Sequence, residues 1–595
     1  MKFFIFYLLF ISTTFFGFSQ NMTIANSYYE QGKFEEALAT YEQIYNQNKG
    51  SSQAILGLAK TYRQLKRFED AISILKKGLE INPERLIFSM EIGVTYHLNE
   101  ETEKAQESFE KTIELVRQNP TQASYIGHSF QKYNLLKPAI ECYKISIEEN
   151  PNPNYNEIIG QMYGELGDFG NMFSYYLDFM LAKPAYIGHI QRRRLNDFIT
   201  EDPENDANII FRKVLLKKNQ DNPDVLYNEL LSWLFTQQKQ FRKAFLQEKA
   251  IYKITDEGIP QIISLGLTAK EAKDYETAEE ILQFVVENTD IEVFKLKAEN
   301  ELMRIKTQTY PKKQYATINK EYLDLIEKYG KERNNLEILL DYARFLGFKQ
   351  DNRQEAIKFL KPLLKKDFFG IQKAQIEVLL GDILVLDNKF NQALIYYSRA
   401  QKKAKDNPVA QEARFKTAKA SYYKGDFDWA KTQLNVLKSA TTQLIANDAM
   451  ELALLIDDNT KEDSIFTALK KFAKAELYTF QEKNDEALNE YDELLNEFAG
   501  NSIEDDALFK QAQLYYKLGQ PEKAIANYEK LIRLYPTSLR IDDTYFELAI
   551  IYLSQENEEK AKALFEKIIF NHADSIHYVE ARKKYRKLRG DAIVN

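Results

Sequence analysis

The chain has 595 residues, which is too many for one compact core and suggests several domains or an array of repeats. Its 22 glycines and 14 prolines amount to about half of the usual share of roughly 12%, so long helices are favoured over a turn-rich β fold. The formal net charge of −8 gives no reason to expect nucleic acid as a partner, and the single cysteine excludes an internal disulfide and a cysteine-based zinc site. This composition favours a binding or scaffolding protein, without metal or cofactor, over an enzyme.

The first segment, residues 1–19, has the pattern of a secretory signal peptide. It begins with Lys2, continues through an apolar stretch from Phe3 to Phe18, and ends in small residues two apart, Gly17 and Ser19. We expect cleavage after Ser19; the alternative is an uncleaved anchor, although the stretch is short for a span of about 20 residues. No cysteine stands at the cleavage point, so a lipoprotein is not supported. The sequence predicts an exported chain, periplasmic or secreted.

The segment that follows repeats itself every 34 residues. Each of the first four units has a small residue, an aromatic residue three positions later, an alanine and a large apolar residue. These are Ala25, Tyr28, Ala37 and Tyr41; Ala59, Tyr62, Ala71 and Leu75; Gly93, Tyr96, Ala105 and Phe109; Gly127, Phe130, Ala139 and Tyr143. Such self-similarity is typical of repeat architectures, in which each unit is one supersecondary element.

This pattern, with Pro83 and Pro151 closing repeats, resembles the tetratricopeptide repeat. The resemblance implies two antiparallel helices per unit, and neighbouring pairs must stack because one pair cannot bury its own apolar face. The small residue and the alanine would lie where the two helices approach most closely, and the aromatic residues would fill the space between pairs. We therefore expect an all-α, right-handed α-solenoid of about fifteen helix pairs.

The pattern continues less regularly through the rest of the chain. A fifth unit has Met172 where alanine is usual, and later units are anchored by Ala244, Ala278, Ala356, Ala393, Ala430, Ala487, Ala524 and Ala561. The stretches 185–220, 290–335 and 440–465 fit only as degenerate helical pairs. The expected organisation is an N-terminal array over 20–184, a degenerate helical-repeat region over 185–369, and a C-terminal array with a capping helix over 370–595. The lengthened repeats after residue 468 resemble those of envelope assembly and cell-division coordination proteins.

Motifs that carry chemistry are missing from the sequence. His572 and His577 are five residues apart, so they do not share a helical face well, and the chain has neither a glycine-rich phosphate loop nor a nucleophile elbow. Cys142 precedes Tyr143 on an expected second helix, where a buried structural thiol is favoured over a nucleophile. Carboxylates are abundant, but their placement is typical of solvated turns and helix starts. We expect no catalytic residues.

If the chain follows the family it resembles, partners bind the concave face that the first helix of each pair lines. The groove-facing candidates in the first repeats are Asn26, Tyr29, Lys60, Arg63, His97, His128 and Gln131. His97 and His128 fall in adjacent repeats and predict a polar groove whose charge depends on pH; the alternative is that they are ordinary exposed polar residues. Glu91 disfavours the clamping of a partner's C-terminal carboxylate, because it would repel that group.

The last predicted helix carries a basic cluster that includes Arg582, Lys583, Arg586 and Lys587. Tyr578, Ala581, Tyr585 and Leu588 recur at helical spacing and form an apolar stripe. A helix with one packed face is what the end of a repeat array requires, and this capping role is the favoured interpretation. Contact of the basic residues with an anionic membrane surface or polymer is the alternative.

The sequence thus predicts a noncatalytic protein–protein interaction scaffold or adaptor of the bacterial cell envelope, which binds proteins or peptides on its concave surface. Two alternatives remain open. One is an accessory subunit or cryptic hydrolase of envelope biogenesis, with carboxylates in residues 185–365. The other is a binder of cell-wall polymer.

Overall fold

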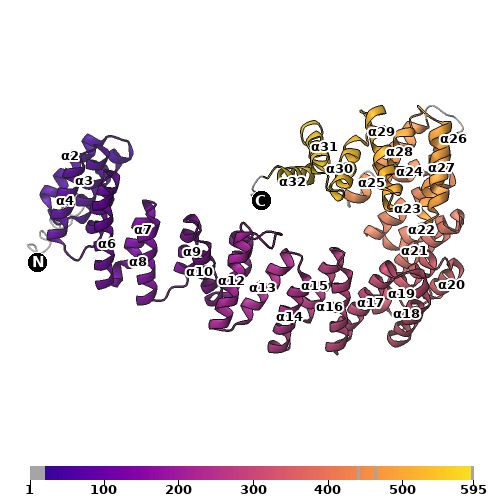
Figure 1. The fold of residues 1–595 in the computed structure, drawn as a ribbon, viewed down its shortest axis with the longest axis horizontal. Coiled ribbons are helices and arrows are strands. Elements are labelled where there is room, and N and C mark those ends of the chain that lie inside the picture. Colours follow the sequence, from indigo (N-terminus) through magenta and orange to yellow (C-terminus); the bar gives the residue numbers. More distant parts are fainter. Residues whose placement is uncertain (1–20, 406, 438–442, 461–465, 591–595) are drawn as a thin grey trace, which may run out of the picture. The chain divides into compact units, whose positions relative to one another are not determined.

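A computed structural model describes residues 21–405, 407–437, 443–460 and 466–590 (Figure 1). The predicted signal peptide, 1–19, lies outside the described residues. Every regular element within the described ranges is a helix, so the prediction of an all-α solenoid of stacked helical repeats is confirmed. In this part of the chain no helix combines the length and the apolar character that crossing a membrane would need.

The chain divides into two compact units that meet at Asp256 and Glu257. The first unit opens with helical residues 21–30. It continues with α2 (Phe34–Gln47), α3 (Ser52–Gln64), α4 (Phe68–Ile81), α5 (Ile87–Leu98), α6 (Thr102–Gln118), α7 (Ala123–Lys132), α8 (Leu136–Glu149), α9 (Asn154–Glu165), α10 (Phe169–Ala182), α11 (Ile187–Ile190), α12 (Asp206–Asp221), α13 (Val225–Gln237) and α14 (Phe241–Thr255). Short 3₁₀ turns stand at Pro120–Gln122 and Pro184–Tyr186, and a π-helical turn at Gln191–Leu195 interrupts the regular pairing.

The second unit contains α15 (Ile259–Glu271), α16 (Tyr275–Asn288), α17 (Glu292–Thr309), α18 (Tyr315–Tyr329), α19 (Leu336–Arg344), α20 (Arg353–Leu363), α21 (Gly370–Leu386), α22 (Phe390–Ala404), α23 (Pro408–Lys424), α24 (Phe427–Leu437), α25 (Gln443–Asn459), α26 (Thr467–Phe480), α27 (Asn484–Glu497), α28 (Glu504–Lys517), α29 (Pro521–Leu534), α30 (Ile541–Ser554), α31 (Glu558–Asn571) and α32 (Tyr578–Arg589). A π-helical turn, Phe345–Lys349, follows α19, and 3₁₀ turns precede α18 and α19.

Close approach of the two helices in a pair explains the small residues of the repeat. A Cβ atom on Gly93 would lie 2.7 Å from the ring of Phe109, and one on Gly160 would lie 2.7 Å from the ring of Tyr176. The anchoring alanines from Ala37 to Ala561 are all buried to 2% exposure or less. The predicted roles of the small residue and the alanine are therefore confirmed.

The turn inside many of the pairs places one residue in the left-handed region, and the spacing of these residues gives the repeat length. In the first four pairs these residues are Gly32, Lys66, Glu100 and Asn134, which are 34 residues apart. In the second unit the spacing is 37 residues, as in Asp351, Asn388 and Gly425, and again in Glu482, Gly519 and Glu556. Only some of these turns use glycine, although glycine adopts a positive φ at the lowest cost. The lengthened period therefore begins well before residue 468.

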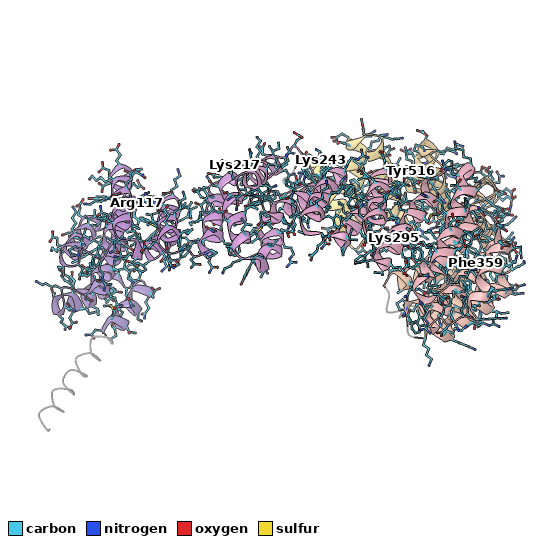
Figure 2. The ribbon with its side chains drawn as sticks, turned by 90° about the horizontal axis from the view of Figure 1, so that it is seen from below. Arg117, Lys217, Lys243, Lys295, Phe359 and Tyr516 are labelled. Atoms are coloured by element: carbon cyan, nitrogen blue, oxygen red, sulfur yellow. The ribbon has the colours of Figure 1, made fainter. Side chains whose placement is uncertain are left out.

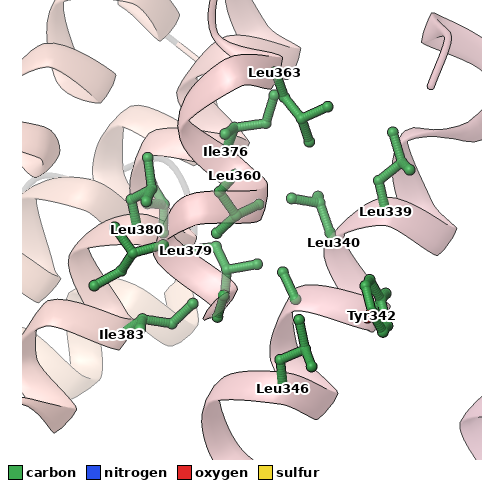
Figure 3. Packing of buried hydrophobic residues seen from close by; sticks show 14 of the residues in the cluster. Leu339, Leu340, Tyr342, Leu346, Leu360, Leu363, Ile376, Leu379, Leu380 and Ile383 are labelled. Carbon is green, nitrogen blue, oxygen red and sulfur yellow. The ribbon is translucent and has the colours of Figure 1, made fainter. Parts of the chain in front are cut away.

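Apolar side chains from successive pairs form continuous clusters along each unit. In the second unit one such cluster contains Leu339 and Tyr342 of α19, Leu360 of α20, and Leu379 and Ile383 of α21 (Figure 3). Charged side chains cover the outside, such as Arg117, Lys217 and Lys243, all of which are exposed (Figure 2). Each helix pair thus buries its apolar face against its neighbours, as expected for a repeat array.

Candidate partner-binding surfaces

The seven N-terminal candidates fall in two rows along the first helices of the pairs. Asn26, Lys60 and His128 each follow the small residue of their repeat, and we name them the inner row. Tyr29, Arg63, His97 and Gln131 each stand three positions later and form the outer row. Residues in one row are separated by one or more repeat lengths, so they occupy equivalent positions on consecutive pairs.

In the first two repeats the candidate side chains contact one another. The hydroxyl of Tyr41 donates a hydrogen bond of 2.5 Å to Oδ1 of Asn26. The ammonium of Lys60 lies 4.0 Å from the ring centroid of Tyr29, within reach of a cation–π interaction. Burial lowers the pKa of Lys60, while the neighbouring carboxylate of Glu30 opposes that shift. These contacts bring Asn26, Tyr29 and Lys60 into one amphipathic surface.

Arg63, by contrast, is committed to an internal ion pair. Its guanidinium lies 2.5 Å from the carboxylate of Glu91 and donates a second hydrogen bond, of 3.0 Å, to the hydroxyl of Tyr133. Burial opposes the charge, but Glu91 and Tyr133 together hold the pKa of Arg63 above its ordinary value. Arg63 is 8% exposed, so it fastens α3 to α5 and to the end of α7. The negative charge of Glu91 is therefore paired with the positive charge of Arg63.

The remaining N-terminal candidates are accessible but separate. His97 and His128 are exposed on α5 and α7 and belong to different rows. His97 lies beside Phe109, with ring centroids 6.4 Å apart. Gln131 is half-buried and accepts a hydrogen bond of 3.1 Å from the hydroxyl of Tyr143. Among the described contacts none joins the two histidines, so the structure does not bring them together as a pair.

The C-terminal basic residues lie on α32 as the sequence predicted. Ala581 is fully buried, and Tyr585 and Leu588 pack with it against the core formed by α28 to α31. Arg582, Lys583 and Lys587 are exposed on the same helix, and Arg586 is half-buried. The helix therefore has one packed face and one solvated face, which is the geometry that a capping helix requires.

Sequence reasoning missed the most unusual feature of the second unit, helix α25. The anchors Ala393 and Ala430 are 37 residues apart, and so are Ala487 and Ala524, but Ala430 and Ala487 are separated by 57. The excess of 20 residues contains α25, and α26 packs directly on α23 as the next first helix of the array. The interpretation of 440–465 as a degenerate helical pair is wrong, because this stretch contributes one inserted helix. The break in the 37-residue spacing is the signal that could have found it.

Helix α25 packs mainly on α24, and it also contacts the first helices α23 and α26 of the pairs around it. Its buried face contains Ala449, Leu452, Ala453 and Ile456, which pack with residues of α23, α24 and α26. Glu451 lies 2.6 Å from the guanidinium of Arg540, at the start of α30, and 4.0 Å from the ammonium of Lys510 on α28. At the far end Ser502 donates a hydrogen bond of 2.8 Å to Asn459. The inserted helix thus touches several consecutive repeats (Figure 1).

A cavity of about 230 Å³ remains between α25 and the neighbouring helices α23, α26 and α28. Its charged lining residues are Lys419, Lys510 and Arg540 together with Asp448, Glu451 and Glu476. Lys419 and Glu476 follow Ala418 and Ala475, so they occupy the same repeat position as the inner row. Burial raises the pKa of Glu451, but Arg540 outweighs it and leaves that pKa below its usual value. The cavity therefore balances its charges internally.

Cys142 is fully buried on α8, and burial raises the pKa of its thiol to about 12, so it is protonated at neutral pH. The described ranges contain no cluster of three or more histidine, cysteine or carboxylate side chains placed to bind a metal.

Comparison with known proteins agrees with the helical pairing at both ends of the chain. The family described as tetratricopeptide repeat matches residues 28–90, 506–538 and 542–569. A TPR repeat-containing protein of Methanocaldococcus jannaschii is 27% identical over 167 residues, which cover 28% of this chain and 29% of that protein. Tetratricopeptide repeat protein 13 of Homo sapiens is 29% identical over 85 residues, or 14% of this chain and 10% of that protein. The chain is therefore a helical solenoid in which residues 28–90, 506–538 and 542–569 match the tetratricopeptide repeat.

Proposed function

We propose that the protein is a noncatalytic scaffold of the bacterial cell envelope that binds segments of other proteins on the first helices of its repeats. The observation that carries the binding part is α25, because its Glu451, Ala453 and Asn459 dock one helix across several repeats of the array. A surface that holds a helix of its own chain has the shape and chemistry to hold a partner helix. Preformed repeats also lower the ordering cost of binding.

The envelope location rests on the predicted signal peptide, residues 1–19, and on the resemblance of the C-terminal repeats to envelope proteins. This location is tested by determining the N-terminal residue of the protein recovered from its native host. Mass spectrometry of the periplasmic fraction should find a chain that begins at Gln20. A chain found in the cytoplasm with Met1 retained would refute the proposed location.

The binding role is tested by pull-down from envelope extracts, followed by chemical cross-linking and mass spectrometry. We expect proteins cross-linked to α3, α5 and α7, and their recovery should fall in the variant with His97→Ala and His128→Ala. Tyr125→Ala, at another exposed site on α7, is the matched control. Recovery of glycan alone would replace this proposal with a binder of cell-wall polymer, and hydrolysis of an envelope substrate would replace it with an enzyme.

A further inference from the structure

Large apolar side chains are exposed where α25 meets the starts of α30 and α32. Met450 and Leu454 on the outer side of α25 are 45% and 42% exposed, and Leu539 and Ile576 are 72% and 79% exposed. All four line one groove of about 420 Å³. Exposing such residues together is unfavourable in water, so an apolar patch of this kind indicates a surface that binds another molecule.

Carboxylates surround these apolar side chains. The groove is lined by Glu451, Asp458, Asp505, Asp506 and Asp543, and its described lining has one basic residue, Arg540. The guanidinium of Arg540 is already engaged, at 2.6 Å from Glu451 and 2.9 Å from Asp506. His577 lies 2.9 Å from Asp543, outside the lining. Lys510 also lies 4.0 Å from Glu451, and Asp505 accepts a hydrogen bond of 2.5 Å from Ser538. Carboxylates are therefore the predominant charged groups of the lining.

We propose that this groove docks a partner polypeptide segment that combines apolar side chains with lysine or arginine. This inference rests on the proposed scaffold function and names the chemistry of one partner. Apolar side chains of the segment would cover Met450, Leu454, Leu539 and Ile576, and its cations would lie near Asp505 and Asp543. An anionic lipid or a nucleic acid would be repelled by the same carboxylates. Because α25 supplies a large part of the lining, the groove would not form without this inserted helix.

The first experiment uses a phage library of random 12-residue peptides, selected on the full chain. Each selected pool is then tested on the variant with Leu539→Lys and Ile576→Lys, which reverses the apolar and acidic character of the groove. Both sites are exposed, so the substitutions leave the core intact. The matched control is Phe570→Lys, since Phe570 is 71% exposed on α31 and does not line the groove.

We expect peptides that bind the wild-type chain and the control, lose at least tenfold in affinity on the groove variant, and carry lysine or arginine beside apolar residues. The inference is overturned if no peptide distinguishes the wild-type chain from the groove variant. It is also overturned if the distinguishing peptides are acidic, or if the wild-type chain forms a dimer that the groove variant abolishes, because a second copy would then be the occupant.

A second measurement tests the electrostatic part with the strongest selected peptide. Asp505→Asn removes the charge and keeps one oxygen, which can accept the hydrogen bond of 2.5 Å from Ser538 or the one of 2.9 Å from the backbone N–H of Asp506. The affinity of this variant for the peptide should fall about threefold or more and should depend less on salt concentration, because one attractive charge is gone. Asp485→Asn, in the first turn of α27 and outside the groove, should leave both unchanged. Equal effects of the two variants would refute the role of the groove carboxylates.

Failure here is distinguishable from failure of the scaffold proposal. If the groove variant still captures the same envelope proteins through α3, α5 and α7, the groove inference is wrong and the scaffold stands. If neither peptides nor envelope proteins bind the chain, both are wrong.

Discussion

Arg540 and Glu451 form an ion pair of 2.6 Å between residues that are 89 positions apart in the chain. The same guanidinium lies 2.9 Å from Asp506, so one largely buried side chain joins α25 to the starts of α28 and α30. The insertion is thereby fixed to repeats that follow it, rather than only to the helices on either side of it.

We expect Arg540→Met to destabilise the second unit by about 3 kcal/mol, because it leaves the largely buried Asp506 and the half-exposed Glu451 without their partner. Urea unfolding measures the loss, and hydrogen exchange of residues 445–459 should accelerate. Arg533→Met, at an exposed site on α29, is the matched control and should change the free energy of unfolding by less than about 0.5 kcal/mol. Similar losses in both variants would contradict the assigned role of Arg540.

The buried pair of Arg63 and Glu91 makes a second prediction. Arg63→Met leaves Glu91 buried and unpaired, and it should cost about 3–5 kcal/mol of stability. Adding Glu91→Leu removes the stranded charge, so the double variant should recover most of the loss. Urea unfolding of the three chains measures the coupling. If the double variant is less stable than Arg63→Met, the unpaired charge of Glu91 is not the cause of the loss, and the prediction is wrong.

The close approach at Gly93 predicts opposite effects for one substitution at two glycines. Gly170→Ala on α10 meets no atom closer than 3.7 Å, so the better helix propensity of alanine should stabilise the fold by up to about 1 kcal/mol. Gly93→Ala forces the ring of Phe109 to move and should destabilise it. Thermal unfolding decides the signs, and stabilisation by both would disprove the tight contact.

The start of α32 should respond to pH through His577. Its ring stacks on Phe546 at 4.2 Å, and its hydrogen bond to Asp543 raises the pKa of the imidazole above 6.5. A raised pKa in the folded state means that the stabilisation is fully present below 6.5 and is lost as pH rises through the folded value. The difference in melting temperature between wild type and His577→Gln should therefore shrink from pH 5.5 to pH 9. A constant difference would rule out a protonated His577.

The capping role of α32 is tested by deleting residues 578–595. Removal uncovers the apolar residues that Ala581 and Tyr585 cover, so the melting temperature should fall. Replacing the exposed Arg582, Lys583 and Lys587 by alanine should leave it unchanged. Sedimentation with vesicles of anionic lipid is measured on the same chains. Binding that is lost in the alanine variant would favour the membrane-contact alternative.

Much of the fold could be predicted from the sequence, because a repeat carries its own local rules. The spacing of Ala37, Ala71 and Ala105 marks the buried side of each second helix, and small residues such as Gly93 mark the close approach. Side-chain direction in a helix follows from position alone, so a periodic pattern determines which face is buried. The accessible candidates His97 and His128 were identified in the same way.

What the sequence determined by itself was therefore the helical pairing, the buried anchors and the basic cap. The tertiary structure decided that Arg63 is withdrawn into an ion pair with Glu91, and that α25 lies across the repeats and reaches Arg540. The physical reason is that periodicity tells which face of each helix is buried, but not which charged side chains of neighbouring or more distant repeats meet there. Contacts between charges that are tens of residues apart depend on how the repeats stack, and no local pattern records that stacking.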